Sequence, residues 1–226
     1  MRRMPRLILD IETVGKDIGS FDEASREYLL KFAENDDERK EVEESLSFYP
    51  LTGEIIAIGL LNPETEKGAV YFQTPGEDPR LPFEEQGIRY ETGTEKEILR
   101  MFWNTVKSYD EIVSFNGRSF DCPFIIVRSA VHGIKPTKDL MPNRYSNAHI
   151  DLMDRLMFFG ASRRRFSLHM WCTAFGIKSP KENVTGHEVG GMFRQGRHVE
   201  IAKYCAEDLR ATKELLSYWD KYIKFP

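Results

Sequence analysis

The stretch LILDIETVG, residues 7–15, decides the fold and raises the first chemical question. Its apolar residues indicate a buried strand, and residues two apart in a strand point to the same face. Asp10 and Glu12 therefore place two carboxylates side by side near a hydrophobic core. Because buried like charges are costly, we expect either a positive group against them or a strand that reaches the surface there.

The overall composition is typical of a globular protein. The chain has 226 residues, of which 41% are hydrophobic and 30% charged, enough for one large domain or two small ones. The formal net charge is −4 at pH 7. This balance does not indicate nucleic-acid binding, and it does not exclude it, because a local basic patch is sufficient.

The first residues and the cysteines favour a cytoplasmic protein. The basic start, MRRMPR, is followed by an apolar run that Asp10 interrupts, too short for a signal peptide or a membrane span. The three cysteines, Cys122, Cys172 and Cys205, form no CxxC pair. We therefore expect no membrane association, no disulfide framework and no zinc site, and we expect the cysteines to be buried as apolar residues.

Early strands followed by alternating strands and helices predict one α/β domain with a mixed sheet over residues 1–226. The apolar periodicity predicts the following elements: strands at 7–11, 53–62, 69–72 and 111–115; helices at 94–109, 120–132, 167–175 and 199–222; and a short strand or turn running into a helix at 150–159. The Gly- and Pro-containing segment 75–90 is predicted to be a loop.

A charged insertion interrupts this pattern at about residues 20–48. Its apolar positions fit one face of a helix and are Phe21, Tyr28, Leu29, Phe32 and Ala33. Residues 35–44 are almost all charged, which predicts an exposed helix or a mobile loop that serves mainly to keep the segment solvated.

Two further stretches carry carboxylates on regular elements. In IVSFNGRSFDCPFI, residues 112–125, a strand runs into a turn at Asn116-Gly117, and Asp121 opens a helix. Asp121 is either a functional residue or the N-cap of that helix, where Asp is favoured. In IAKYCAEDLRATKELLSYW, residues 201–219, Tyr204 and Asp208 share one helical face, which is expected to pack on the sheet.

Taken together, the three stretches indicate a metal site. Each provides hard oxygen ligands on a rigid element, and such ligands suit Mg²⁺ or Mn²⁺ rather than zinc. Two ions about 3.5–4 Å apart can hold a phosphodiester between them. Bound cations would also neutralise Asp10 and Glu12, which answers the question raised by the first strand.

These motifs resemble those of the DEDD superfamily of 3′–5′ exonucleases, which have a ribonuclease H-like fold. The branch that the chain resembles comprises predicted exonucleases related to the proofreading domain of family B DNA polymerases. LDIET, with Asp10 and Glu12, is similar to the first motif, FNGRSFDCP, with Asp121, to the second, and YCAED, with Tyr204 and Asp208, to the third. The sister branch has a His where this chain has Lys203, so the chain resembles the tyrosine type.

The resemblance implies a set of roles. Asp10, Glu12 and Asp208 would hold a first Mg²⁺ or Mn²⁺ ion, Asp10 would bridge to a second, and Asp121 would support the second directly or through water. Tyr204 would orient the attacking water, because a free phenol, with a pKa of about 10, is a poor base at neutral pH. Cleavage of the last phosphodiester would release a 5′-monophosphate.

Substrate contacts are predicted on both sides of the motifs. By resemblance, the backbone near Ile11 and Thr13 would contact the terminal sugar. Asn116 and Phe120 could touch a sugar or base, although Phe120 is equally suited to the core. Phosphate contacts are expected from basic residues, since these supply most of the affinity for a polyanion. The candidates are Arg118 and the run Arg163, Arg164 and Arg165, for which a solvated turn is the alternative.

Several functions remain open at this point. The tyrosine and the polymerase-like second motif favour single-stranded DNA ends as substrate, but an RNA-directed exonuclease fits the same residues. A non-catalytic nucleic-acid-binding module on the same fold, or an unrelated α/β protein with structural acids, would also carry them. Asp151, in HIDLMD, is predicted to orient the sheet edge or to cap the next helix rather than to bind metal.

Overall fold

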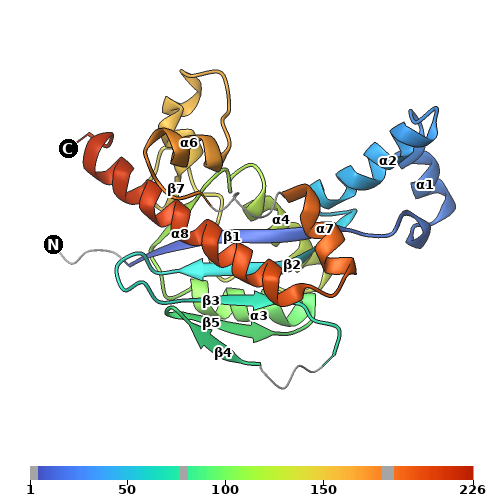
Figure 1. Ribbon diagram of the computed structural model, residues 1–226, viewed down its shortest axis with the longest axis horizontal. Coiled ribbons are helices and arrows are strands. Elements are labelled where there is room, and N and C mark those ends of the chain that lie inside the picture. The colour runs from blue at the N-terminus through green and yellow to red at the C-terminus, as the bar shows by residue number, and fades with distance from the viewer. Residues whose placement is uncertain (1–4, 77–80, 180–185, 226) are drawn as a thin grey trace.

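The computed structural model describes residues 5–76, 81–179 and 186–225. Its strands form one seven-stranded mixed sheet in the order β4-β5-β3-β2-β1-β6-β7 (Figure 1). The strands are β1 (Arg6–Gly15), β2 (Gly53–Leu61), β3 (Gly68–Phe72), β4 (Phe83–Glu85), β5 (Ile88–Thr92), β6 (Glu111–Ser114) and β7 (His149–Asp151). β1 lies inside the sheet, antiparallel to β2 and parallel to β6. The predicted α/β class and mixed sheet are confirmed.

The chain also forms eight helices in its described residues, some of which cover the two faces of the sheet. They are α1 (Glu23–Leu30), α2 (Asp36–Ser45), α3 (Glu95–Val106), α4 (Asp121–Val131), α5 (Leu152–Leu156), α6 (Leu168–Ala174), α7 (Gly186–Arg194) and α8 (His198–Tyr222), with short 3₁₀ turns η1 (Ile18–Ser20), η2 (Leu46–Phe48) and η3 (Phe158–Gly160). The long helix α8 crosses one face over β1 and β2, and α3 and α4 pack on the other (Figure 1).

The alternation of side chains along β1 connects the two cores. Ile8 belongs to the core under α8, whereas Leu7, Leu9 and Ile11 belong to the core under α3 and α4. Because side chains two apart share a face, Asp10 follows Ile8 onto the α8 side of the sheet. The first strand thus carries its carboxylates toward the C-terminal helix, more than 190 residues away in the sequence.

A buried ion pair fixes helix α4 to the rest of the domain. Glu95 at the start of α3 is 5% exposed and Arg128 on α4 is 3% exposed. The Arg128 guanidinium donates two hydrogen bonds to the Glu95 carboxylate, at 2.8 and 2.6 Å. Glu95 also accepts the main-chain N–H of Ile55 on β2 at 2.8 Å. One carboxylate therefore connects α3, α4 and β2.

The charged insertion forms two helices that project from the domain (Figure 1). Neither α1 nor α2 has a buried residue. Tyr28 is 78% exposed and Phe32 is 84% exposed, so the predicted apolar face does not pack against the sheet. The helices are held by local caps instead: Asp22 accepts the N–H of Ser25, and Asn35 accepts that of Glu38.

One sequence prediction is wrong, and one helix was not predicted. The segment predicted as a loop over 75–90 contains β4 and the beginning of β5, which pair antiparallel at the edge of the sheet. These strands are short, and β4 has only exposed or half-buried residues, so it carries little apolar signal. Helix α7 was not predicted either, because the glycines at 186, 190 and 191 disfavour a helix by local propensity.

No helix in the described part of the chain combines the length and the apolar character needed to span a bilayer.

Candidate active site

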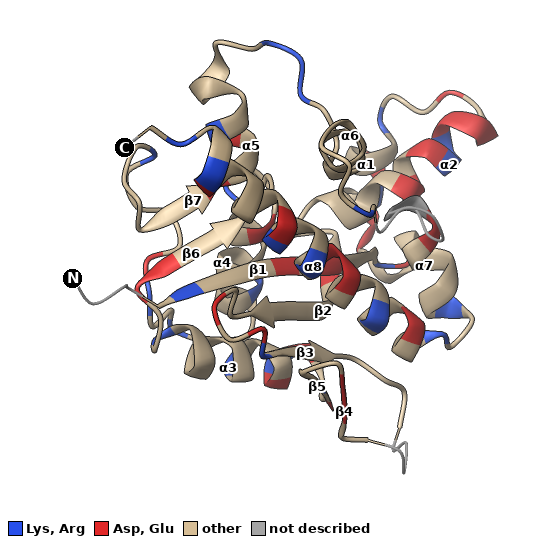
Figure 2. Ribbon diagram, turned by 60° about the vertical axis from the view of Figure 1, so that its left-hand side comes forward, with Lys and Arg blue, Asp and Glu red and all other residues tan. Residues whose placement is uncertain are grey.

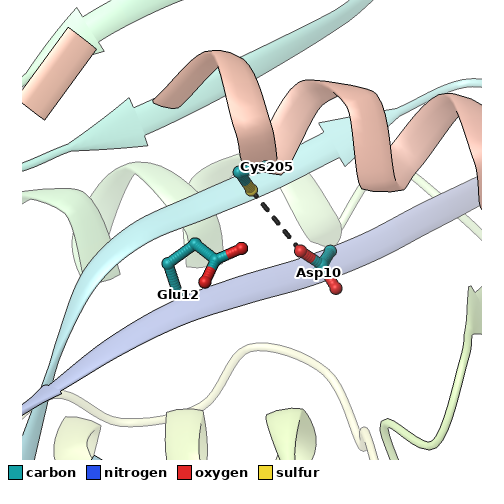
Figure 3. A group of neighbouring side chains, drawn as sticks. All are labelled: Asp10, Glu12 and Cys205. Carbon is teal, nitrogen blue, oxygen red and sulfur yellow. Dashed lines mark hydrogen bonds between the residues drawn. The ribbon is translucent and has the colours of Figure 1, made fainter. Parts of the chain in front are cut away.

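Two carboxylates and a thiol meet between β1 and α8. Asp10 is half-buried, and Glu12 is 8% exposed. Figure 3 shows both side chains on the same side of β1, with the Cys205 sulfur of α8 above them. One ligand atom from each of the three residues lies within 4.8 Å of the other two. The predicted pairing of Asp10 with Glu12 is therefore present, and Cys205 adds a third possible ligand.

The pairing of β1 with β2 is irregular just after this pair, where β2 carries one extra residue, Ile56. Glu12 is opposite Ala57 of β2, but the next residue, Thr13, is opposite Ile55, so the register shifts by one residue between them. Such bulges bend a strand and change the direction of its side chains. The Thr13 hydroxyl then donates to the carbonyl of Ser47 at 2.8 Å. The extra residue lies on β2, so β1 itself continues past Glu12 without an inserted residue.

Asp121 connects the second motif to the first strand. It is the first residue of α4 and is 5% exposed. Its Oδ1 accepts the main-chain N–H of Ile11 at 3.0 Å, so this backbone group is already engaged by the protein. The alternative in which Asp121 is the N-cap does not hold, since Phe120 is the residue at that position. Asp121 instead holds α4 against the stretch between Asp10 and Glu12.

Asp151 shapes the loop that leads to Asp121. It caps α5, as predicted, by accepting the N–H groups of Met153 and Asp154. Its two oxygens also accept the main-chain N–H groups of Asn116 and Arg118, each at 3.0 Å. Asn116 has a positive φ of 64°, a conformation in which Asn is enriched. Asp151 is therefore a buried support for the turn.

The third motif comes from α8. Tyr204 is 7% exposed and packs in a small core that includes Val14 and Ile56. Asp208, one turn further along, is half-buried. Lys203, which precedes Tyr204, is exposed and forms an ion pair with Glu85 of β4 at 2.7 Å. Lys203 is therefore turned to the edge of the sheet, while Tyr204 lies inside.

The carboxylates of the three motifs act on one another. Burial is the main cause that raises the pKa of Asp10 well above its usual range, and neighbouring carboxylates raise it further: in decreasing order, Asp208, Asp121 and Glu12. Burial likewise raises the pKa of Asp121 to about 7, with Asp151 and Asp208 adding to the shift. Figure 2 shows the acidic segments of β1 and α8 next to each other. Such a cluster of buried and half-buried oxygen donors fits divalent cations.

Two side chains near the cluster, the Tyr204 phenol and the Cys205 thiol, stay protonated. Burial, followed by the carboxylates of Asp208 and Glu12, raises the pKa of the Tyr204 phenol. Burial also raises the pKa of the Cys205 thiol well above its usual range. The thiol donates to Oδ2 of Asp10 at 3.6 Å. Both groups are therefore neutral hydrogen-bond donors at neutral pH.

The predicted substrate contacts belong to different parts of the fold. Phe120 is half-buried and packs against the ring of Phe124. The Arg118 guanidinium donates to the carbonyl of Pro142 at 2.8 Å. Residues 163–165 are exposed in the loop before α6, coloured blue in Figure 2, and the Arg164 guanidinium lies 5.2 Å from the centre of the Phe166 ring.

A cleft of about 940 Å³ opens beside the end of β1. It begins at Thr13 and is lined by η1, α2 and α7. Its basic residues are Lys16, Lys40 and Arg194, and its acidic residues include Glu43 and Glu44. The charged insertion therefore forms one wall of a cleft whose lining on β1 includes Thr13 but not Asp10 or Glu12.

Residues 80–216 match the model of a family of predicted 3′–5′ exonucleases related to the exonuclease domain of PolB. The chain belongs to this family. The match includes Asp121, Tyr204 and Asp208, whereas Asp10 and Glu12 precede it. The recognition based on the three motifs is confirmed.

Archaeal DNA polymerases are similar to this family member in sequence and fold. A DNA polymerase of Pyrococcus glycovorans is 29% identical over 139 residues, and one of Desulfurococcus sp. (strain Tok) is 28% identical over 142. Each alignment covers 54% of this chain and 18% of the polymerase. The family B DNA polymerase of Pyrobaculum calidifontis aligns with 96% of this chain and 24% of its own, at 17% identity and a TM-score of 0.61. This likeness confirms the ribonuclease H-like fold.

Two features of this exonuclease-family site were not predicted. Cys205 was expected to be only an apolar core residue. It is buried, but its sulfur contacts Asp10. Its position three residues before Asp208 on one helix was the available signal. The role of Asp151 in holding the 116–118 turn had no sequence signal, because the two segments are more than 30 residues apart.

Proposed function

We propose that this chain is a metal-dependent 3′–5′ exonuclease. It hydrolyses the terminal phosphodiester of single-stranded nucleic acid, DNA in preference to RNA, and releases 5′-monophosphates. The observation that carries this proposal is the convergence of carboxylates from three elements: Asp10 and Glu12 lie side by side on β1, Asp121 of α4 accepts the Ile11 N–H between them, and Asp208 of α8 acts on Asp10. A fold has no structural need for such mutual repulsion, and cations would relieve it.

The donor set fits two divalent cations, Mg²⁺ or Mn²⁺. Asp10, Glu12 and Asp208 would hold one ion, and Asp10 and Asp121 the other. When bound, such ions acidify the attacking water and stabilise the charge that develops on the phosphate oxygens. All four side chains are fixed on β1, α4 or α8, so they are positioned before the substrate arrives.

Tyr204 has a positioning task in this reaction. Its phenol keeps its proton at neutral pH because burial raises its pKa. A neutral phenol cannot act as a general base, but it can donate or accept a hydrogen bond and so orient the water for in-line attack. The ring packs in the core with Val14, which fixes the direction of the hydroxyl.

The substrate strand would approach through the surroundings of Thr13. The cleft there is lined by Thr13 and offers Lys16, Lys40 and Arg194 to phosphates, beside four acidic residues, Asp17, Glu43, Glu44 and Glu54. The Ile11 N–H is already bound by Asp121, so Thr13 would meet the terminal sugar without it, and Asn116 and Phe120 would border it. Arg118 and Arg163 to Arg165 would contact phosphates further along. The sheet and its helices would act as a single exonuclease-like domain over residues 1–226.

A cleavage assay with single-stranded oligonucleotides tests the proposal. The 5′-labelled substrate should shorten from its 3′ end in Mg²⁺ or Mn²⁺ and stay intact in EDTA or with a blocked 3′ end. Asp208→Asn should abolish cleavage, whereas Glu207→Gln should not, because Glu207 is the adjacent exposed carboxylate on the same helix. Retention of full activity by Asp208→Asn would refute the proposed site.

Two alternatives give different results in the same assay. A non-catalytic binding module would bind the oligonucleotide in a gel-shift experiment but leave its length unchanged under every metal condition. An RNA-directed exonuclease would shorten the RNA oligonucleotide faster than the DNA oligonucleotide of the same sequence. Faster DNA cleavage is the result expected here.

A further inference from the structure

Three aromatic side chains form a platform on the surface beside α5. Tyr145 is 68% exposed and Phe158 is 55% exposed, whereas Phe159 is half-buried. The rings of Tyr145 and Phe159 meet edge to face, with their centres 4.8 Å apart. The aromatic platform of Tyr145, Phe158 and Phe159 therefore presents two open rings next to one that is partly covered.

The backbone under the platform is strained. Phe158 and Phe159 have φ values of 49° and 55°, in the left-handed region that bulky residues rarely adopt. Such conformations persist only where the surrounding structure holds them, and they are frequent at ligand sites. The hydrophobic core gains little from Phe158, because more than half of this residue stays in water. Burial therefore does not explain the exposed ring, and a ligand that stacks on it would.

Arginines surround the platform. Residues 142–166 contain five arginines and two aspartates, a formal charge of +3 in a chain whose net charge is −4. The guanidinium carbon of Arg155 lies 5.0 Å from the centre of the Phe159 ring. Arg155 donates to the carbonyl of Ser146 at 2.9 Å and to Oδ1 of Asn147 at 3.1 Å, and both acceptors are uncharged. Figure 2 shows basic segments on α5 and along the loop that follows it. A local basic patch is thus present although the overall charge is negative.

One carboxylate in this patch serves several arginines. Asp154 accepts two hydrogen bonds from Arg144, whose guanidinium carbon lies 6.0 Å from the centre of the Phe159 ring. These hydrogen bonds are the main cause that lowers the pKa of Asp154, and the charges of Arg118 and Arg165 lower it further. Three guanidinium groups therefore share one negative charge, and the excess positive charge suits phosphates.

The platform is attached to the second motif. Asp151, the N-cap of α5, accepts the main-chain N–H groups of Asn116 and Arg118, each at 3.0 Å. The Arg118 guanidinium donates to the carbonyl of Pro142 at 2.8 Å. The turn that leads into α4 is thus bound to the chain on both sides of Tyr145. A strand that ends at the carboxylate cluster can continue onto this part of the surface.

We propose that the aromatic platform binds the unpaired bases of a single-stranded nucleic acid, with the surrounding arginines on its phosphates. The inference rests on the proposed function, because the bound nucleotides lie on the 5′ side of the terminal phosphodiester that is cleaved. Every base has a π face that stacks on an aromatic ring, so the platform accepts any sequence. Base pairing hides these faces, so the platform selects an unpaired strand over a duplex.

An oligonucleotide that lacks its bases tests the stacking. Fluorescence anisotropy measures binding of a 5′-labelled oligothymidylate of about 12 nucleotides and of an abasic oligomer with the same number of phosphates. Both are titrated with the full chain in EDTA, which prevents metal-dependent cleavage, and at one fixed salt concentration.

The platform variant is Tyr145→Leu with Phe158→Leu. Leucine keeps apolar bulk at both positions but has no π face. The matched control is Tyr28→Leu with Phe32→Leu, because these two rings are also exposed and belong to the acidic insertion on and just after α1. Both variants therefore lose one tyrosine and one phenylalanine from the surface.

Wild type and the control should bind the oligothymidylate at least about tenfold more tightly than the abasic oligomer. Stacking on one ring contributes about fivefold or more in affinity, and two rings are available. In the platform variant this preference should fall below about threefold, while affinity for the abasic oligomer changes by less than about twofold, since the arginines remain.

Three results would overturn the inference. The first is a wild-type protein that binds both oligomers equally or binds neither. The second is a platform variant that keeps the preference, which would assign the exposed rings to another partner, such as a protein. The third is an equal loss of affinity for both oligomers, which would assign the rings a structural role in placing the arginines.

The outcome is separable from that of the exonuclease proposal. Base-dependent binding that is lost in the platform variant, together with no cleavage in Mg²⁺ or Mn²⁺, would refute the exonuclease proposal alone. Cleavage by wild-type protein that shows no base-dependent binding would refute the platform alone.

Discussion

The main-chain N–H of Ile11 donates a hydrogen bond to Oδ1 of Asp121, 3.0 Å away. Ile11 stands between the two carboxylates of the first strand, so this bond fixes the start of α4 next to them. Asp121, which follows Ile11 by 110 positions in the sequence, is thereby placed next to the first motif. The bond also means that the Asp121 side chain has both a structural and a proposed metal-binding role, and these can be separated.

Asp121→Asn should separate the two roles. The amide oxygen can still accept the Ile11 N–H, but the negative charge is lost. We expect the variant to fold and cleavage to fall by at least about 100-fold, since charge stabilisation in the site is lost. Asp121→Ala also removes the acceptor and should cost a further 1–3 kcal/mol or so in unfolding free energy. Urea unfolding and the oligonucleotide assay measure the two effects.

Tyr204→Phe should reduce turnover without removing metal. The ring stays in the core, and only the hydroxyl that would orient water is lost. We expect kcat to fall by about 10- to 100-fold, with little change in KM and in Mn²⁺ affinity. Steady-state kinetics and a Mn²⁺ titration test this. If Mn²⁺ affinity falls in parallel with kcat, the hydroxyl serves the metal site rather than the water.

The basic run at 163–165 should affect binding through its charge. If Arg163, Arg164 and Arg165 contact phosphates, replacing all three by Ala lowers affinity for single-stranded DNA and reduces the slope of log K against log salt by about 0.7 per lost contact. The control replaces Lys96, Arg100 and Lys107 on or beside α3, which covers the opposite face of the sheet from α8. Equal slopes in the two triple variants would favour the solvated-turn alternative.

Stability at low pH should depend on Glu95. Burial alone would raise the pKa of Glu95, but hydrogen bonds from Arg128, His132 and the Ile55 N–H outweigh it, so the pKa lies below the ordinary value of 4.5. For a carboxyl with a lowered pKa, the stabilisation is present above the unfolded-state value. It is lost as pH falls through the folded-state value. Urea midpoints measured downward from pH 5 should therefore fall more steeply for wild type than for Glu95→Gln.

At neutral pH, Glu95→Gln should lower the free energy of unfolding by about 3 kcal/mol, because Arg128 is left as a buried charge without its carboxylate. Replacing both residues, as in Glu95→Gln with Arg128→Met, should restore most of that loss. A double variant less stable than the sum of the two single changes would show that the ion pair is not the reason.

The projecting insertion should be dispensable for folding. Residues 22–45 contain ten acidic and four basic side chains, and neither helix has a buried residue. Replacing them with a short Gly/Ser linker, while keeping the buried Leu46, should change the free energy of unfolding by less than about 1 kcal/mol. Mn²⁺ affinity should be unchanged. A larger loss of stability would mean that the contacts of α2 with β1 stabilise the domain.

Much of the sheet could be predicted from local sequence. β1 and β2 are recognisable because buried strands need continuous apolar runs, and α3 because Thr94 and Glu97 form a capping box before an apolar stripe. β4 could not be recognised, since a short edge strand with exposed residues is stabilised by pairing with β5 rather than by burial. α7 was missed because tertiary packing of Val189 and Met192 outweighs its glycines.

The sequence by itself determined which carboxylates are set in apolar surroundings: Asp10 and Glu12 on a strand, Asp121 at a helix start and Asp208 on the last helix. Burial of a charged residue is visible in the pattern of its immediate neighbours. Only the tertiary structure decided that Cys205 contacts Asp10, that Asp151 holds the 116–118 turn and that the insertion borders a cleft. These are contacts between distant segments, and they depend on strand order and helix placement, which local periodicity does not specify.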